Sequence, residues 1–197
     1  MKDFHFSLNL GLIGTDDSRI DVILDHLKEK GKRSSSKDSE NEFQFIYENV
    51  PLKVKIFQFK HFEYLSEDFK QLKKLDGIIV AVNLYNDQAI SNLTLNKYKE
   101  FCIKFLFDGI SVLVGIDPYL IEQRKPPLSR YINEFVLIQK AKELKFHYCF
   151  KILNSQKDIT DIFNKVLNYV NTKLEFINPE KFERVKTGSN DVVRKHL

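Results

Sequence analysis

The sequence is poor in cysteine, has no long apolar run and carries no strong excess of one charge. Its two cysteines, Cys102 and Cys149, lie inside apolar stretches, as is typical of reduced core thiols and not of a disulfide framework. No segment approaches the roughly 20 apolar residues that a membrane-spanning helix needs. The opening "MKDFHFSLNL" lacks the apolar run of a signal peptide. These absences favour a soluble intracellular protein with no membrane partner.

The charges of the chain are balanced and mixed. Lys and Arg number 31 against 27 Asp and Glu, which gives a formal net charge of +4. Both signs are interleaved, as is typical of a solvated surface and not of a basic stripe for nucleic acid, so no nucleic-acid contact is required. Hydrophobic residues make up 43% of the 197 residues and include 17 Phe. This composition predicts one domain with a substantial core.

Apolar runs typical of strands alternate with runs of helical periodicity. We expect strands at about residues 7–13, on both sides of a turn at residues 48–51, and at about residues 76–84, 110–117 and 146–152. We expect helices from near Asp17 or Ser18, over about residues 67–74 and 87–107, from a Ser129 cap to about residue 145, and from a cap near Asp158 to about residue 174. The order predicts an α/β fold with a mostly parallel six-stranded sheet and helices on both faces. The antiparallel strand pair favours a small-GTPase-like G domain within that class.

The sequence divides into a G-like domain over residues 1–177 and a charged tail over residues 178–197. Within the domain, the polar and Ser-rich stretch at about residues 29–42 has no apolar anchor, so we interpret it as a mobile loop. The tail after Pro179 also has few apolar anchors, which predicts a flexible or partner-bound segment.

The stretch "LGLIGTDDSRIDVILDHL" has the strand–turn–helix form of a phosphate-binding loop without its chemistry. Such a loop needs glycines, a Lys for the terminal phosphates and a Ser or Thr for magnesium. The last two positions fall near Ile20 and Asp21, which cannot do these tasks. Carboxylates in the turn would repel phosphate at a helix N-terminus. The degenerate loop consists of Gly14, Thr15, Asp16, Asp17 and Ser18.

Three other places where a GTPase carries its chemistry also lack it. The stretch "IFQFKHF" has no Asp or Gly for magnesium and the γ-phosphate, "GIDPYL" replaces the Asn-Lys-x-Asp run that recognises guanine, and the last strand ends in "KILNS". The five histidines show no metal-ligand spacing. We therefore expect a non-catalytic relative of the GTPases with no catalytic residue, no nucleotide or other cofactor and no metal site.

Three stretches together resemble the centromere protein M family. They are "GLIGTDDSRIDVILDHLKEK", "LDGIIVAVNLYNDQAISNLTLNKY", and "FDGISVLVGID" with the later "AKELKFHYCF". The resemblance covers about residues 10–30 and 75–170. It implies an inactive G domain that acts as a structural subunit of the constitutive inner kinetochore, in the nucleus. It also implies that centromere protein I and the centromere protein H/K pair are the partners.

Without catalysis, the function must lie in surfaces. The expected helix after Ser129 has a second apolar stripe opposite Leu137, Ala141 and Leu144, and a helix packed on a sheet needs only one. Two aromatic residues near the C-terminus are further candidates, although they can equally pack back on the domain. The candidate partner-binding residues are Leu128, Ile132, Phe135, Val136, Phe176 and Phe182.

Two other functions stay open from the sequence. The strand pair "NEFQFIYENVPLKVKIFQF" is longer than the centromere protein M pattern, which leaves an inactive G-domain adaptor or chaperone in clathrin-dependent vesicle traffic as an alternative. The second alternative is a divergent GTP-binding protein that binds nucleotide in an unusual way.

Overall fold

The computed structural model describes residues 6–30, 32–33, 41–60, 62, 75–126, 131–153 and 155–194. Its strands are β1 Phe6–Ile13, β2 Lys32–Arg33, β3 Glu42–Tyr47, β4 Val50–Phe59, β5 Gly77–Asn83, β6 Ile110–Ile116 and β7 Tyr148–Ile152. Its helices are α1 Ile20–Lys30, α2 Asp87–Ser91, α3 Leu95–Lys104, α4 Pro118–Ile121, α5 Glu134–Leu144, α6 Ser155–Ile177 and α7 Pro179–Arg194. A 3-10 turn at Asp16–Ser18 precedes α1. The expected helix at residues 67–74 lies outside the described residues.

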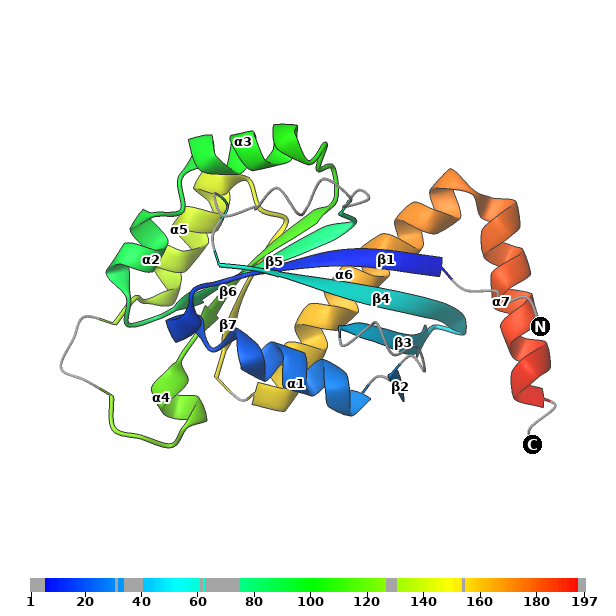
Figure 1. Ribbon diagram of the computed structural model, residues 1–197, viewed down its shortest axis with the longest axis horizontal. Coiled ribbons are helices and arrows are strands. Elements are labelled where there is room, and N and C mark those ends of the chain that lie inside the picture. The colour runs from blue at the N-terminus through cyan, green and yellow to red at the C-terminus, as the bar shows by residue number, and fades with distance from the viewer. Residues whose placement is uncertain are drawn as a thin grey trace.

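The strands form one sheet in the order β2-β3-β4-β1-β5-β6-β7 (Figure 1). β4, β1, β5, β6 and β7 are parallel to their neighbours in this order, and β3 is antiparallel to both β2 and β4. This confirms an α/β fold with a mostly parallel sheet. All six expected strands are present, and the two-residue edge strand β2 extends the sheet from within the polar stretch that we interpreted as a loop. The bounds of that loop are wrong, because α1 continues to Lys30.

Helices cover both faces of the sheet. One core layer joins β1 and β4 to apolar residues of α1, α6 and α7. The other layer joins β5 to residues of α2, α3 and α5, which Figure 1 shows together on one side of the sheet. β5 and β6 are buried along their whole length, as expected for apolar central strands covered on both faces.

The predicted turn between β3 and β4 is confirmed and is tight. Tyr47 pairs with Val50, so only Glu48 and Asn49 connect the strands. Both have positive φ, 49° and 65°, which is the conformation of a type I′ hairpin turn. The buried alternation of Leu52, Val54 and Ile56 along β4 is confirmed as well.

Several helix boundaries differ from the expectation, two of them because a side-chain cap begins the helix at another residue. The helix expected over residues 87–107 is interrupted, since the Thr94 hydroxyl accepts the Lys97 N–H at 3.4 Å and begins α3. The helix expected from Ser129, which lies outside the described residues, begins instead after Asn133, whose side chain accepts the Val136 N–H at 3.0 Å. α6 begins at Ser155, before the expected cap at residue 158.

The expectation of a flexible tail is wrong for residues 179–194, which form α7. Phe182 and Val185 are 4% and 2% exposed, and the Phe182 ring stacks on Phe6 of β1 with the centroids 6.2 Å apart. Figure 1 places α7 at the end of the sheet away from α2. Two apolar side chains therefore anchor the helix to the core through a contact distant in sequence.

Two histidines with lowered pKa values, His26 and His147, are expected to make the protein less stable in mild acid. His26 of α1 lies 3.1 Å from the Thr160 hydroxyl of α6 through Nε2, and burial, aided by Lys30, lowers its pKa. His147 accepts the Ser111 N–H through Nδ1 at 3.1 Å, and burial lowers its pKa. The unfolded chain therefore binds these protons first, near pH 6.5. The two neutral histidines therefore make their full contribution to the free energy of unfolding above that pH. This contribution is lost as the pH falls through their lower pKa values in the folded protein.

The measurement is the melting temperature between pH 7.5 and pH 5. We expect it to fall, and we expect the double variant His26→Gln and His147→Gln to show a smaller fall over the same range. A melting temperature that stays constant or rises toward pH 5 in the unmodified chain would contradict the prediction.

Candidate functional site

The loops at the carboxyl ends of β1, β5 and β6 form the candidate site. β1 and β5 are neighbours in the sheet. After β1 the chain continues to the half of the sheet that contains β4, and after β5 it continues to the half that contains β6. Ligands of open α/β sheets bind outside the carboxyl ends of the strands where the direction reverses in this way. The degenerate loop lies at this point.

The turn that follows β1 is closed on itself. The Ser18 N–H and hydroxyl both donate to the Thr15 carbonyl, at 2.9 and 2.6 Å, and Ser18 is fully buried. The Gly14 N–H donates to the Phe59 carbonyl at 2.9 Å. Arg19 then has a left-handed conformation, with φ of 53°, so α1 begins at Ile20 and not at the predicted residue 17 or 18. The N–H groups of Gly14 and Ser18 therefore donate within the chain and are not directed toward a ligand.

The Asp17 carboxylate connects this turn to the loop after β5. It accepts hydrogen bonds from the Thr15 hydroxyl, from Asn86 Nδ2 at 2.7 Å and from Asn83 Nδ2 at 3.4 Å. Burial raises the pKa of Asp17, but the three hydrogen bonds outweigh it and hold the pKa below its usual value. The turn thus contains a fixed negative charge at neutral pH.

Sequence reasoning placed Asp17 in the degenerate loop but did not identify its hydrogen-bond partners. We interpreted it as part of the start of the helix, whereas its hydrogen bonds lead to Asn83 and Asn86. The available signal was Asn83 itself, a polar residue that ends the apolar run "GIIVAV". The side chain of Asp16 lies outside the described part of the structure.

Arg19 connects the β1 turn to α4. Its guanidinium group pairs with Asp21 at 2.9 Å and also with Glu122, the residue after α4. The hydrogen bond from Arg19 lowers the pKa of Asp21 despite the opposing effect of burial. Asp21 stands near the position where a phosphate loop has its magnesium ligand, and here it is half of an ion pair within the chain.

Asp117, which belongs to the stretch expected in place of a guanine-recognition run, caps a helix in the structure. Its Oδ1 accepts the N–H groups of Tyr119 and Leu120 at 3.1 and 2.9 Å, which starts α4. Beside it, the ring centroid of Tyr85 lies 4.9 Å from that of Tyr119 and 5.0 Å from that of Tyr131. Contacts between side chains of the chain itself therefore stabilise the loops after β5 and β6.

The structure separates the candidate partner-binding residues into two groups. Phe135 and Val136 of α5 and Phe176 of α6 are exposed, by 68%, 38% and 89%. Ile132 and Phe182 are buried in the two core layers, so proposing them as contact residues was wrong. Leu128 lies outside the described residues. The opposite face of α5, with Leu137, Ala141 and Leu144, packs on the sheet as predicted.

No protein-family model matches the chain, and no curated protein matches it in sequence. Within the described ranges, no three His, Cys, Asp or Glu side chains gather as they would to hold a metal ion. In the same ranges, none of the helices has the length and apolar character needed to cross a membrane. The geometry therefore carries the functional argument.

Proposed function

We propose that the protein is a non-catalytic, G-domain-like scaffold that binds other proteins. The observation that carries the proposal is the Asp17 carboxylate, held by Thr15, Asn83 and Asn86 inside the turn where a GTPase would hold phosphate. A fixed negative charge at that position opposes phosphate binding. The antiparallel β3–β4 pair beside β1 supports a G-like fold, because we take such a pair in a mostly parallel sheet as a feature of small-GTPase-like domains.

The setting we propose is the inner kinetochore, on the resemblance to the centromere protein M family. In that setting the rigid sheet supports centromere protein I and the centromere protein H/K pair in the nucleus. The exposed aromatic side chains of Phe135 on α5 and Phe176 on α6 are accessible for contacts with such partners.

One experiment with two readouts tests the proposal. The purified chain is titrated with GTP and with GDP in the presence of Mg²⁺ by calorimetry, and we expect no saturable binding of either nucleotide. The tagged chain is then co-expressed with centromere proteins I, H and K, and we expect all three to co-purify with it.

The two readouts test different parts of the proposal. Micromolar binding of GTP or GDP would contradict the non-catalytic assignment and favour a divergent GTP-binding protein. Absence of nucleotide binding together with capture of clathrin-adaptor subunits in place of the centromere proteins would keep the scaffold and reject the kinetochore setting.

A further inference from the structure

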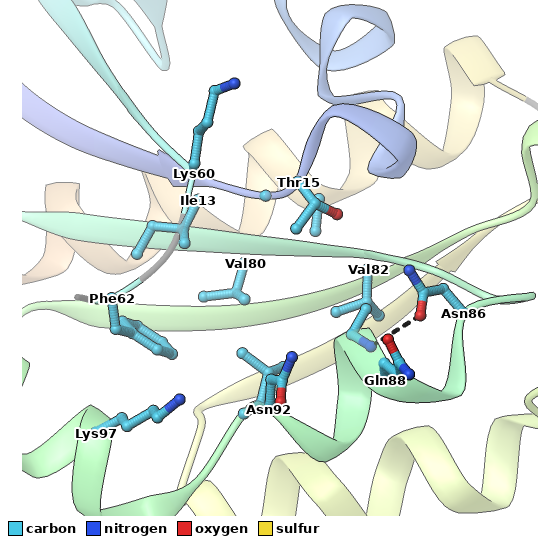
Figure 2. Close-up of a pocket in the computed structure, with 14 residues that line it drawn as sticks. Ile13, Thr15, Lys60, Phe62, Val80, Val82, Asn86, Gln88, Asn92 and Lys97 are labelled. Carbon is cyan, nitrogen blue, oxygen red and sulfur yellow. Dashed lines mark hydrogen bonds between the residues drawn. The ribbon is translucent and has the colours of Figure 1, made fainter. Parts of the chain in front are cut away.

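A pocket of about 330 Å³ lies at the carboxyl ends of the central strands, and several of its polar lining residues are engaged within the chain (Figure 2). Asn86 bonds to Asp17 and to the Ala89 N–H, and Lys60 and Lys97 have interactions of their own. Large exposed apolar side chains occur instead at the opposite end of the sheet, where β5 and β6 begin.

Four large apolar side chains are exposed at that end, and we call them the end surface. Their exposed fractions lie between 66% and 89%. Two belong to the end of α3 and the loop after it, and two belong to the end of α6; they are Ile103, Leu106, Phe176 and Ile177. Exposed apolar groups that gather in this way mark interaction surfaces.

An ion pair joins the two halves of the end surface. Lys173 Nζ of α6 lies 3.3 Å from Asp108 Oδ1, in the loop after α3. Asp108 follows Leu106 by two residues, and Lys173 precedes Phe176 by three. Figure 1 shows the last turns of α3 and α6 on the same upper side of the molecule. The ion pair therefore holds the two exposed apolar pairs at one end of the sheet.

The backbone of Leu106 indicates that the fold of the single chain does not require a leucine there. Its φ is 48°, in the left-handed region that favours glycine and disfavours residues with a Cβ atom. Its side chain is exposed, so it gains little from packing within the chain. An unfavourable backbone conformation without a contribution to the core points to a contact outside the chain.

The two sides of the end surface carry charges of opposite sign. The charged neighbours on the α3 side are Lys99, Glu100 and Lys104, all exposed. On the α6 side, Glu175 and Glu180 are exposed, while Lys181 lies over the Phe6 ring. In a two-fold symmetric pair of chains with the axis through the end surface, the α3 side of one copy faces the α6 side of the other. The lysines of one copy then face the glutamates of the other.

We propose that the end surface binds a second copy of this chain in a two-fold symmetric dimer. With their exposed fractions, the four residues present roughly 600 Å² of surface, which matches the largest apolar patches of typical monomers. Two copies would bury about 1,200 Å² in total, the lower limit for a stable interface. The dimer goes beyond the scaffold function, because association of two copies needs no other protein.

An interface of this size predicts a weak dimer, with a dissociation constant on the order of 100 µM. The test is sedimentation velocity of the full chain at concentrations from about 10 µM to about 500 µM. We expect a monomer at the low end and a reversible shift toward the dimer at the high end. The chain is accordingly a monomer at the low micromolar concentrations used in unfolding experiments.

Matched variants locate the interface. Phe176→Ser is expected to raise the dissociation constant at least about tenfold, the loss of one large apolar contact. Leu106→Gly is expected to do the same without lowering the melting temperature at low concentration, because glycine suits a φ of 48°. Phe135→Ser removes a similarly exposed ring from α5, outside the end surface, and is expected to leave the dimer unchanged.

Charge reversal tests the two-fold arrangement. Lys104→Glu and Glu175→Lys are each expected to weaken the dimer about threefold to tenfold, because each places like charges across the interface. The variant with both changes restores opposite charges and is expected to dimerise within about twofold of the unmodified chain. Circular dichroism of each variant at low concentration establishes that it is folded.

A chain that stays monomeric over the whole concentration range would overturn the inference. So would equal weakening of the dimer by Phe176→Ser and Phe135→Ser, or a dimer of Leu106→Gly as stable as that of the unmodified chain. Failure of the double charge reversal to restore dimerisation would overturn the two-fold arrangement. These measurements use the chain alone, so they are independent of the nucleotide titration and the co-purification that test the proposed scaffold.

Discussion

Replacing Gly14 with alanine is expected to lower the free energy of unfolding by about 2–3 kcal/mol, the cost of overpacking a closed site. A Cβ atom at Gly14 would lie 2.4 Å from Ser18 Oγ and 3.1 Å from the Ala81 carbonyl oxygen. Neither neighbour moves easily, since Ser18 is fully buried and its hydroxyl is bound to the Thr15 carbonyl. Urea denaturation followed by circular dichroism measures the change.

A double-mutant cycle separates this contact from a general effect of alanine in the turn. Ser18→Ala alone is expected to cost about 1 kcal/mol for its lost hydrogen bond. In the double variant with Gly14→Ala the close contact with Oγ is gone, so we expect a loss at least about 1 kcal/mol smaller than the sum of the two single losses. Additive losses would show that close packing on Ser18 is not the reason for the glycine.

The same variants test the role of Gly14. In a phosphate-binding loop the glycine lets the backbone approach the ligand, whereas here it lets β1 approach Ser18 and Ala81. We therefore expect the destabilisation by Gly14→Ala to be the same with and without GTP. The packing of the sheet and α1 therefore requires the form of this turn.

The central strands were predictable because their signal is local and strong. "GIIVAVN" and "ISVLVGI" are nearly continuous apolar runs, which is what a parallel strand covered on both faces requires. The break between α2 and α3 was not predicted, because the helical periodicity continues across it. A single side-chain cap at Thr94 determines the break, and periodicity does not report caps.

Residue types alone predict that the turn does not bind phosphate, which stays a prediction, and they do not indicate what holds the turn in place. The hydrogen bonds of Asp17 to Asn83 and Asn86, however, cross 66 and 69 residues of sequence, and the ion pair of Arg19 with Glu122 crosses a longer separation. No local pattern encodes such contacts, because they depend on which strands become neighbours in the sheet.

Replacing Phe182 with alanine is expected to lower the free energy of unfolding by about 3–4 kcal/mol, as for other buried Phe→Ala changes. The Phe182 ring is 4% exposed and stacks on Phe6, and Lys181 Nζ lies 5.2 Å from the centre of the Phe6 ring. Phe176→Ala is the matched control. Its side chain is 89% exposed, so we expect a change within about 0.5 kcal/mol. Urea denaturation of both variants provides the comparison.

Hydrogen exchange identifies where the stability is lost. With Phe182 truncated, Val185 is the remaining fully buried apolar side chain among the residues of α7 whose burial is described. We therefore expect the amides of α7 to exchange faster in Phe182→Ala than those of β5, because weakly anchored terminal elements open first. Equal losses of stability in Phe176→Ala and Phe182→Ala would contradict the packing of α7. So would unchanged exchange in α7, because this helix belongs to the core only if the Phe182 contact with Phe6 holds it there.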